Sequence, residues 1–469
     1  MVLKWMGRVL GVLGINLLLM ISLVCAQDAA SEKLKLSLEE SVQRALEVNP
    51  QIEEARLDVL QARWQLQSAK YARLPRMELF NLMGVVEDAE VRTYETGDTI
   101  DDHYGFFNRL SLDISIPIYT FGRISRGIDA AARNVDVQQA SEVKTASDLV
   151  LRVHELYYGI LLAGQQLDYL NDLRSSFAEA LRIAEERLEE GEEALVTESD
   201  VLKLRVGLAG VTEGVNRLER ELEVAKAAFR STLEIDELAE FEFADSRLQP
   251  VEYELEPLET YLEMAKTKNP SLRQAMKGVE AQEALYKAEK ARYYPTLLIA
   301  GGLRYAEAPG REDPDNPYLD DDFNYLSAGG AFGIRWDLNL FDTYAGVQER
   351  RVGYLKTRSR LQQAINGIAV QVKERYLRVV EKEAALETGF ESRKSGRALL
   401  ILSLTNFKFG IGSGKDVFEG LSIYAQTGGN YGEAVYDYNM AVAQLLNVVG
   451  ILYERNGPEK AAAMEELKS

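Results

Sequence analysis

Histidine and cysteine, the residue types most suited to acid–base or metal chemistry near neutral pH, are few and scattered in this chain. The sequence holds two histidines and one cysteine. His154 opens the run HELYY, but no second histidine follows at the spacing that lets two imidazoles on one helix share a metal ion. His103 lies in an acidic stretch. We therefore expect no enzyme activity, no catalytic residue, no metal site and no cofactor, and interpret His154 as a packed or partly exposed helix residue.

The run GIGSGKD, which begins at Gly410, shares glycines and a lysine with phosphate-binding loops. Phe409 stands where such a loop needs its first glycine, and Asp416 replaces the Ser or Thr that would hold a metal ion. No strand is expected before it. The pattern argues against nucleotide binding.

Carboxylates follow glycines in two corresponding segments, EGEEALVTESD, which ends at Asp200, and FGIGSGKD, which ends at Asp416. Asp416 and Glu419 are three residues apart, which places them on one side of a helix. Carboxylates at a helix start also cap it and offset the positive end of the helix dipole. The sequence leaves open whether these residues are caps or line a passage.

The composition limits what the rest of the chain can be. Acidic residues outnumber basic ones by 74 to 54, which argues against nucleic acid as the main partner. Residues 1–26 combine Lys4 and Arg8 with an apolar run, and are interpreted as a signal peptide rather than a membrane anchor. Cleavage after Ala26 would remove Cys25, the only cysteine. No later stretch is apolar enough for a transmembrane helix.

An internal repeat organises the chain. Asn49-Pro50 matches Asn269-Pro270 and Pro75 matches Pro295, both at an offset of 220 residues. We expect a first structural repeat over 27–253, a second over 254–458, and a C-terminal tail over 459–469. Prolines are absent from 118–249 and 318–457, which permits long helices. Apolar residues there recur with the 3.5-residue period of a coiled coil, so each repeat should contain a helical hairpin, over about 123–232 and 343–454. The hairpin turns should lie near Gly191 and Gly410.

Each repeat also contains two segments in which apolar and polar residues alternate, as in a strand with one apolar face. The expected strands cover about 76–86, 109–119, 296–306 and 331–341, about the length that a tilted strand needs to cross a bilayer. The linkers inside the pairs, 87–108 and 307–328, each hold seven acidic residues. The residues that we expect to face lipid are Leu110, Leu112, Ile114, Ile116, Phe332, Ile334, Trp336 and Leu338.

Four strands cannot close a barrel, and open strand edges in lipid leave backbone groups unpaired. One solution is a soluble sheet packed on the helices. We favour the other, in which strands from several chains close one barrel, with Asp113, Ser115, Arg335 and Asp337 facing water in its lumen.

The pattern resembles the TolC-like outer-membrane efflux protein family over nearly all of the mature chain. The resemblance rests on LSLEESVQRALEVNPQI from Leu36, PIYTFGR from Pro117, LVTESDVL from Leu195 and FKFGIGSGKDVFEGL from Phe407. It implies a homotrimer with a twelve-stranded β-barrel in the outer membrane of a Gram-negative bacterium, in contact with its lipid. An α-helical periplasmic tunnel would continue the barrel and meet a periplasmic adaptor protein and an inner-membrane transporter.

The resemblance also places the periplasmic tip and gate, at Gly191, Asp200, Phe407, Gly410, Asp416 and Glu419. Glu419 falls where the family has a lumen-facing acid, so threefold symmetry would make a ring of carboxylates. Gly412 stands where some members carry a gating arginine, and the first tip has an apparent three-residue insertion. The expected function is a passive exit duct for efflux or type I secretion. The alternative is a periplasmic coiled-coil protein that braces the envelope without a pore. The sequence does not indicate the exported substrate.

Overall fold

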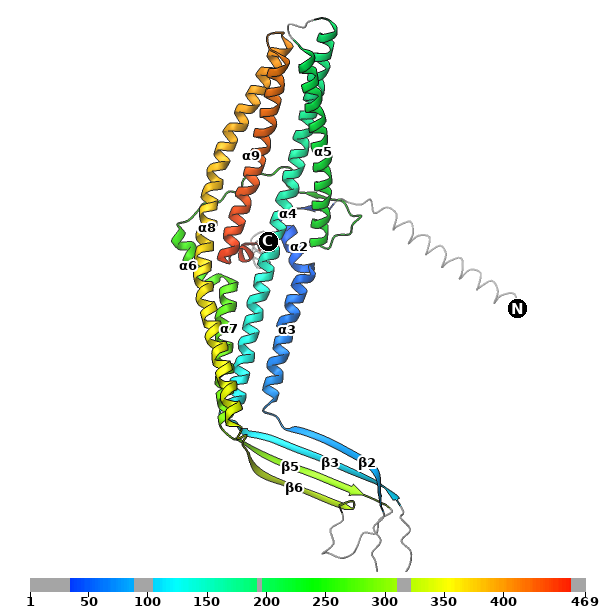
Figure 1. Ribbon diagram of the computed structural model, residues 1–469, viewed down its shortest axis with the longest axis vertical. Coiled ribbons are helices and arrows are strands. Elements are labelled where there is room, and N and C mark those ends of the chain that lie inside the picture. The colour runs from blue at the N-terminus through cyan, green and yellow to red at the C-terminus, as the bar shows by residue number, and fades with distance from the viewer. Residues whose placement is uncertain (1–33, 88–103, 192–195, 310–321, 457–469) are drawn as a thin grey trace, which may run out of the picture. The chain divides into compact units, whose positions relative to one another are not determined.

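The computed structural model of the chain describes residues 34–87, 104–191, 196–309 and 322–456 (Figure 1). The expected signal peptide, most of both acidic linkers and the expected tail over 459–469 lie outside the described residues. The described part is mostly helical, with a four-stranded sheet, as the sequence predicted. Among the described residues, no helix is both long enough and apolar enough to cross a membrane.

The chain divides into two compact units that do not coincide with the two repeats. Unit 1 contains the chain up to Glu54, Val143–Asn269 and Gly367 onward; unit 2 contains Ala55–Glu142 and Pro270–Asn366. Each unit therefore takes a part of both repeats. The helices α4 (Arg123–Glu189) and α8 (Leu340–Lys408) contribute residues to both units.

Unit 1 contains the far parts of both helical hairpins. Helix α4 is followed by α5 (Glu198–Thr232), and α8 is followed by α9 (Gly414–Val449) and the short α10 (Leu452–Asn456). The short helices α2 (Leu38–Val48) and α6 (Leu258–Lys268) occupy corresponding places in the two repeats. Strand β1 (Leu34–Leu36) pairs in parallel with β4 (Phe241–Phe243).

The duplicated Asn-Pro dipeptides connect α2 to α3 (Pro50–Tyr71) and α6 to α7 (Pro270–Lys290). Proline suits the first position of a helix because it lacks the N–H that would be unpaired there. The side-chain amide of Asn49 donates to the carbonyl oxygen of Thr232 at 2.9 Å, and that of Asn269 donates to Val448 at 2.7 Å. Each asparagine thus ties the short helices to the end of the returning helix of its own hairpin.

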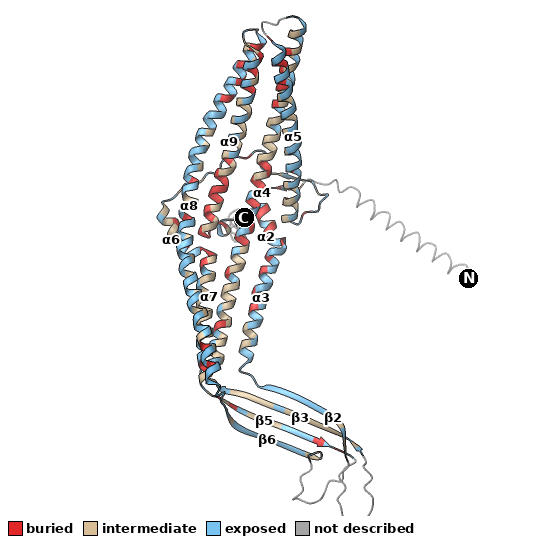
Figure 2. Cartoon of the chain, viewed as in Figure 1, coloured by how far each residue is buried: buried red, intermediate tan, exposed pale blue. Residues whose placement is uncertain are grey.

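Glycines let α4 and α9 pack closely in unit 1. A Cβ atom at Gly428 would lie 2.4 Å from the ring of Tyr169, and one at Gly432 would lie 2.9 Å from Leu162. The Tyr169 hydroxyl donates a hydrogen bond to the carbonyl oxygen of Tyr424. Figure 2 shows buried residues along α9, whereas α8 is mostly exposed.

His154 belongs to this core and is 6% exposed. Its Nδ1 lies 2.8 Å from the carbonyl oxygen of Val150, so the neutral ring donates from that nitrogen. Burial lowers the pKa of His154 below its usual value. The residue is a packed helix residue within hydrogen-bond reach of its own helix.

Unit 2 contains most of α3, all of α7, the 3-10 turn η1 (Ala291–Tyr293), the first parts of α4 and α8, and the sheet. The strands are β2 (Arg76–Glu87), β3 (Tyr104–Tyr119), β5 (Thr296–Glu307) and β6 (Tyr325–Arg335). They are antiparallel in the order β2-β3-β5-β6. In the described part of unit 2, the extensive contacts of the sheet are between its own strands, and no helix covers either face.

Strands β6 and β3 differ from the expected bounds by five residues or more, whereas β2 and β5 differ by one. Strand β6 covers Tyr325–Arg335 instead of 331–341, because its partner β5 begins at Thr296, which pairs with Arg335. Trp336 and Leu338 therefore lie after the strand, although apolar and polar residues still alternate there. Helix α8 then begins at Leu340 instead of 343. Strand β3 begins at Tyr104 instead of 109, because its extra residues pair with the far end of β2.

Candidate functional site

The two hairpin tips begin their returning helices in the same way. At the start of α5, the Thr197 hydroxyl donates to the Asp200 carboxylate at 2.8 Å, and the Thr197 N–H donates to it at 3.2 Å. The Asp200 N–H donates back to the Thr197 hydroxyl at 3.3 Å. At the start of α9, Ser413 and Asp416 make the same three bonds at 2.8, 2.9 and 3.3 Å. Both tips are thus closed by a capping box.

These bonds engage Asp200 and Asp416, two of the three acidic residues expected at the tip. Hydrogen bonds from the Ser413 backbone and side chain hold the pKa of Asp416 below its usual value. Burial acts to raise the pKa of Asp200, but hydrogen bonds from Thr197 and the nearby Lys203 outweigh it and lower that pKa as well. The structure shows Asp416 in a helix cap, and its place in a passage stays a prediction.

Glu419 differs from both. It lies one turn beyond Asp416 on α9, is exposed, and makes no hydrogen bond or ion pair with any residue that the structure describes. Its carboxylate is therefore available to ions or solvent. Its position in a lumen stays a prediction.

The tips also contact each other within the chain. The guanidinium group of Arg187, at the end of α4, donates to the carbonyl oxygens of Phe407 at 2.8 Å and Lys408 at 3.2 Å, at the end of α8. It stacks on the Phe407 ring at 4.8 Å, and that ring is fully buried. A Cβ atom at Gly414 would lie 3.0 Å from Cβ of Asp200. Arg187 of the first hairpin therefore pairs the last carbonyl groups of α8 in the second hairpin, and the two returning helices meet at Gly414.

Several of these contacts were not predicted from the sequence. Arg187 and Phe407 are far apart in sequence, and no local pattern connects them. Thr197 and Ser413 each precede an aspartate by three residues, which is the pattern of a capping box and could have identified both caps.

The turn at the second tip exposes apolar side chains. Gly410 has a φ of +72°, and Gly191 at the first tip has a φ of +80°, the left-handed conformation that glycine adopts without strain. Phe409 and Ile411 flank Gly410 and are 77% and 80% exposed. Two neighbouring apolar side chains that are this exposed form a small contact surface, the apolar tip.

The strand register sorts the side chains of the sheet onto two faces. Directly paired residues share a face, and Ile114 pairs with Met77 and Gly301, Leu112 with Leu79 and Leu303, and Ile299 with Phe332. This apolar face holds six of the eight residues expected to face lipid, Leu110, Leu112, Ile114, Ile116, Phe332 and Ile334. That they face lipid stays a prediction, because lipid is not part of the structure.

The opposite face of the sheet holds most of its charged and hydroxyl side chains, together with apolar ones such as Phe80, Leu82 and Leu298. It carries Asp113 opposite Glu78, Ser115 opposite Arg76, Ser111 opposite Arg304, and Thr296 opposite Arg335. The remaining positions of β5 and β6 on this face are mostly glycine and alanine. Among the described residues, no group of three or more His, Cys, Asp and Glu side chains is placed to hold a metal ion.

The close contact between Gly414 and Asp200 predicts that one added methyl group at Gly414 lowers the stability of the protein. Gly414→Ala should destabilise the protein by about 1–3 kcal/mol, because Cβ of Asp200 cannot swing aside as the end of a flexible side chain could. Gly429→Ala on the same helix is the matched control, since a Cβ atom there meets nothing within 4 Å. It should be neutral or stabilising by about 1 kcal/mol. Thermal unfolding in detergent measures both, and equal effects would contradict the packing at Gly414.

Three comparisons relate this chain to known proteins. Residues 41–231 match the family model described as outer membrane efflux protein. The alkaline protease secretion protein AprF of Pseudomonas aeruginosa is 23% identical over 431 residues, which cover 89% of this chain and 85% of AprF. The outer membrane protein TolC of Vibrio cholerae is 22% identical over 340 residues, which cover 72% of this chain and 75% of TolC.

Solved structures share the fold at low sequence identity. The outer-membrane channel OprN superimposes with a TM-score of 0.73 at 16% identity, over 88% of this chain and 89% of OprN. CusC superimposes with a TM-score of 0.71 at 16% identity, over 90% of this chain and 95% of CusC. The family match, the two relatives and the shared fold agree with the uncovered, two-faced sheet and the duplicated hairpins. The chain is thus similar to the TolC-like outer-membrane efflux proteins, in sequence over residues 41–231 and in fold over most of its length.

Proposed function

We propose that three copies of this chain close one β-barrel and form the outer-membrane exit duct of an efflux or type I secretion system. The protein is located in the outer membrane of a Gram-negative bacterium, with a long periplasmic portion. The observation that carries the proposal is the sheet itself. It has an apolar face and a polar face, no helix of the described part covers either, and β2 and β6 each pair with one strand only.

The open edges support assembly from several copies. A sheet in lipid must pair every backbone group, so β6 of one copy has to meet β2 of the next. Three copies supply twelve strands, the number that the family resemblance implies. The apolar face then meets lipid, and the polar face lines the lumen. A soluble sheet packed on helices would bury its apolar face, whereas Met77, Leu79 and Phe332 are 65%, 67% and 62% exposed.

The repeat identifies a second surface for assembly. The run VHELYY from Val153 corresponds to VKERYL from Val372, and both valines are fully buried. On the adjacent side of α4, Tyr158 and Leu161 are 8% and 9% exposed. Their counterparts on α8, Leu377 and Val380, are 53% and 43% exposed. The chain covers this side of α4 but leaves the same side of α8 bare, and we assign a neighbouring copy to cover it.

The apolar tip supports contact with a periplasmic adaptor, through which the duct would work with an inner-membrane transporter. Phe409 and Ile411 lie on the turn between α8 and α9, outside the core that the tips share. Such side chains gain free energy when a partner buries them. The Arg187 and Gly414 contacts hold the turn in place relative to the first hairpin, so the surface is largely preformed.

The assignment of the two faces is tested by neighbouring residues of β6. Phe332→Arg places a cation on the apolar face, and Ala331→Arg places the same cation on the polar face. A lipid-facing arginine costs about 2–4 kcal/mol at the bilayer midplane. Phe332→Arg should therefore reduce the amount of heat-modifiable oligomer in outer-membrane fractions, and Ala331→Arg should leave it near the wild-type amount. Equal loss in both variants would contradict the facing.

The gate is tested by conductance in a planar bilayer. A ring of like charges in a narrow passage favours cations. Because Asp416 is engaged in a helix cap, Glu419→Ala should reduce cation selectivity and block by trivalent cations more than Asp416→Ala does. Asp416→Ala should instead lower thermal stability by about 1 kcal/mol, through loss of the cap. Selectivity that survives Glu419→Ala undiminished would place the ring elsewhere.

Adaptor docking is tested by crosslinking at the second tip. A cysteine at the exposed Lys415 avoids the capping residue Ser413 and should crosslink to the adaptor in intact cells. In that background, Phe409→Ser and Ile411→Ser should lower the crosslinking yield, because each removes an exposed apolar side chain. Leu238→Ser is the control, since Leu238 is 92% exposed but lies in the segment between α5 and β4. Yields that fall equally in all three variants would argue against the apolar tip.

A further inference from the structure

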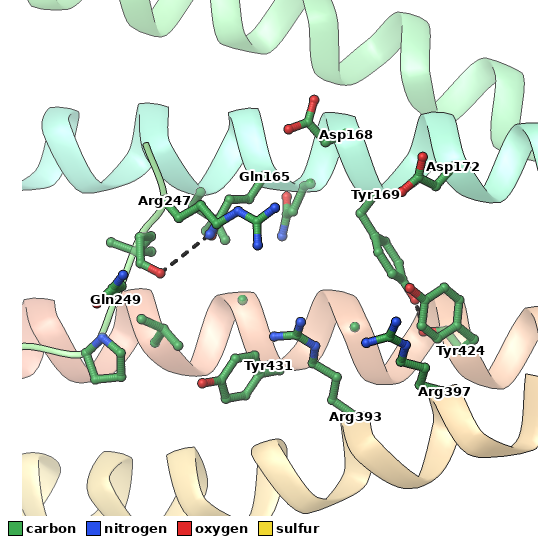
Figure 3. Close-up of a pocket in the computed structure, with 17 residues that line it drawn as sticks. Gln165, Asp168, Tyr169, Asp172, Arg247, Gln249, Arg393, Arg397, Tyr424 and Tyr431 are labelled. Atoms are coloured by element: carbon green, nitrogen blue, oxygen red, sulfur yellow. Dashed lines mark hydrogen bonds between the residues drawn. The ribbon is translucent and has the colours of Figure 1, made fainter. Parts of the chain in front are cut away.

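A pocket of about 520 Å³ lies in unit 1 between α4, α8, α9 and the segment 247–250 (Figure 3). Three arginines line it. Arg247 comes from the segment after β4, and Arg393 and Arg397 lie one turn apart on α8. Figure 3 shows the Arg247 side chain between α4 and α9, and those of Arg393 and Arg397 extending from α8 across α9. Three cationic groups from two separate segments thus line one pocket.

These arginines have no charged partner in the described part of the chain. None of the three makes an ion pair or hydrogen bond there, and Arg393 stacks on the ring of Tyr431 at 5.0 Å. Several other arginines of unit 1 are paired, such as Arg152 with Glu155 at 2.6 Å and Arg182 with Glu179 at 2.9 Å. In a chain with 74 acidic and 54 basic residues, a group of three unpaired arginines is not a consequence of composition.

The carboxylates at the pocket do not neutralise it. Asp168 and Asp172 on α4 are also among its lining residues, but neither makes an ion pair with an arginine of the pocket. Figure 3 shows the carboxylate of Asp168 turned away from the three arginines. The lining side chains therefore carry a net positive charge.

The walls of the pocket are held in place by other contacts. Gly428 packs directly on the Tyr169 ring, whose hydroxyl bonds to the Tyr424 backbone, so α4 and α9 are fixed together at one end. The side-chain amide of Gln165 donates to the carbonyl oxygen of Leu248 at 3.5 Å, which ties the segment 247–250 to α4. The pocket is thus largely formed before any ligand arrives.

We propose that this pocket binds a small anionic ligand that carries two or more carboxylate or phosphate groups. The planar guanidinium fork matches both oxyanions and can donate two parallel hydrogen bonds to either. The ring of Tyr431 stacks against the Arg393 guanidinium group, and Gln165, Gln166 and Gln249 add amide groups to the lining. The volume lies within the range of about 300–1,000 Å³ that is typical of small-molecule sites. The ligand contacts the wall of unit 1, so its binding does not depend on the duct being open.

The experiment titrates the full-length protein, purified in detergent, with citrate and with pyrophosphate at low salt by calorimetry. We expect saturable binding of at least one of them, and the preferred anion identifies carboxylate or phosphate as the ligand group. Arg393→Gln and Arg397→Gln should each weaken binding about tenfold, as expected for the loss of one charge-assisted hydrogen-bonded contact. Arg393→Lys keeps the charge but loses the fork, and should restore only part of the affinity.

Arg217→Gln on α5 is the matched control, because it removes the same charge from an exposed position of unit 1 outside the pocket. It should leave the affinity unchanged, and a thermal melt of each variant reports whether it is folded. The proposal is overturned if neither anion binds saturably, or if Arg217→Gln weakens binding as much as Arg393→Gln. Tighter binding of an acidic tripeptide than of both small anions would overturn the small-ligand assignment in favour of an acidic protein segment.

Discussion

The structure depends on one constraint, the pairing of backbone groups at the two open edges of the sheet. Strands β2 and β6 each have a hydrogen-bonded neighbour on one side only. In lipid every unpaired N–H or C=O group costs several kcal/mol, so neither edge can remain open there. In the proposed assembly other copies of the chain close these edges, and closure in turn creates a lumen for the polar face. The segments that continue as α3, α4, α7 and α8 all meet the strands at the same end of the sheet, because each strand pair is joined at its other end by an acidic linker.

The duplication explains why the helices of one chain, like the sheet, leave a surface without a partner. Corresponding stretches of α4 and α8 each have one buried side, which contains Val153 on α4 and Val372 on α8. The next face is buried on α4 and bare on α8, although apolar residues occupy both. Because the two repeats share a sequence pattern, both α4 and α8 carry an apolar side at this place. Within one chain only the side on α4 is covered, and the side on α8 remains exposed, as the outer edges of β2 and β6 do. The proposed ring of chains would cover the bare side of α8 as well as pair the open strand edges.

Much of this architecture could be predicted from local pattern. The absence of proline and the 3.5-residue period predicted hairpins over 123–232 and 343–454, and the helices observed lie close to those bounds. The end of β6 could not be predicted, because apolar residues keep alternating through Trp336 and Leu338, and only the start of β5 decides where pairing stops. The Arg187 contact with the end of α8 joins residues distant in sequence, and no periodicity reports such a contact.

The contacts at the tips limit how a duct built from this chain can open. Separating the two hairpins of one chain would remove both hydrogen bonds of Arg187 and its stacking on Phe407, and would expose that buried ring. The capping boxes add to this cost, because Asp200 both caps α5 and packs on the first residue of α9. The bare side of α8 makes no such contacts within the described chain. The least costly motion therefore moves the paired tips of one chain as one body relative to those of its neighbours, and the charge on Glu419 moves with them.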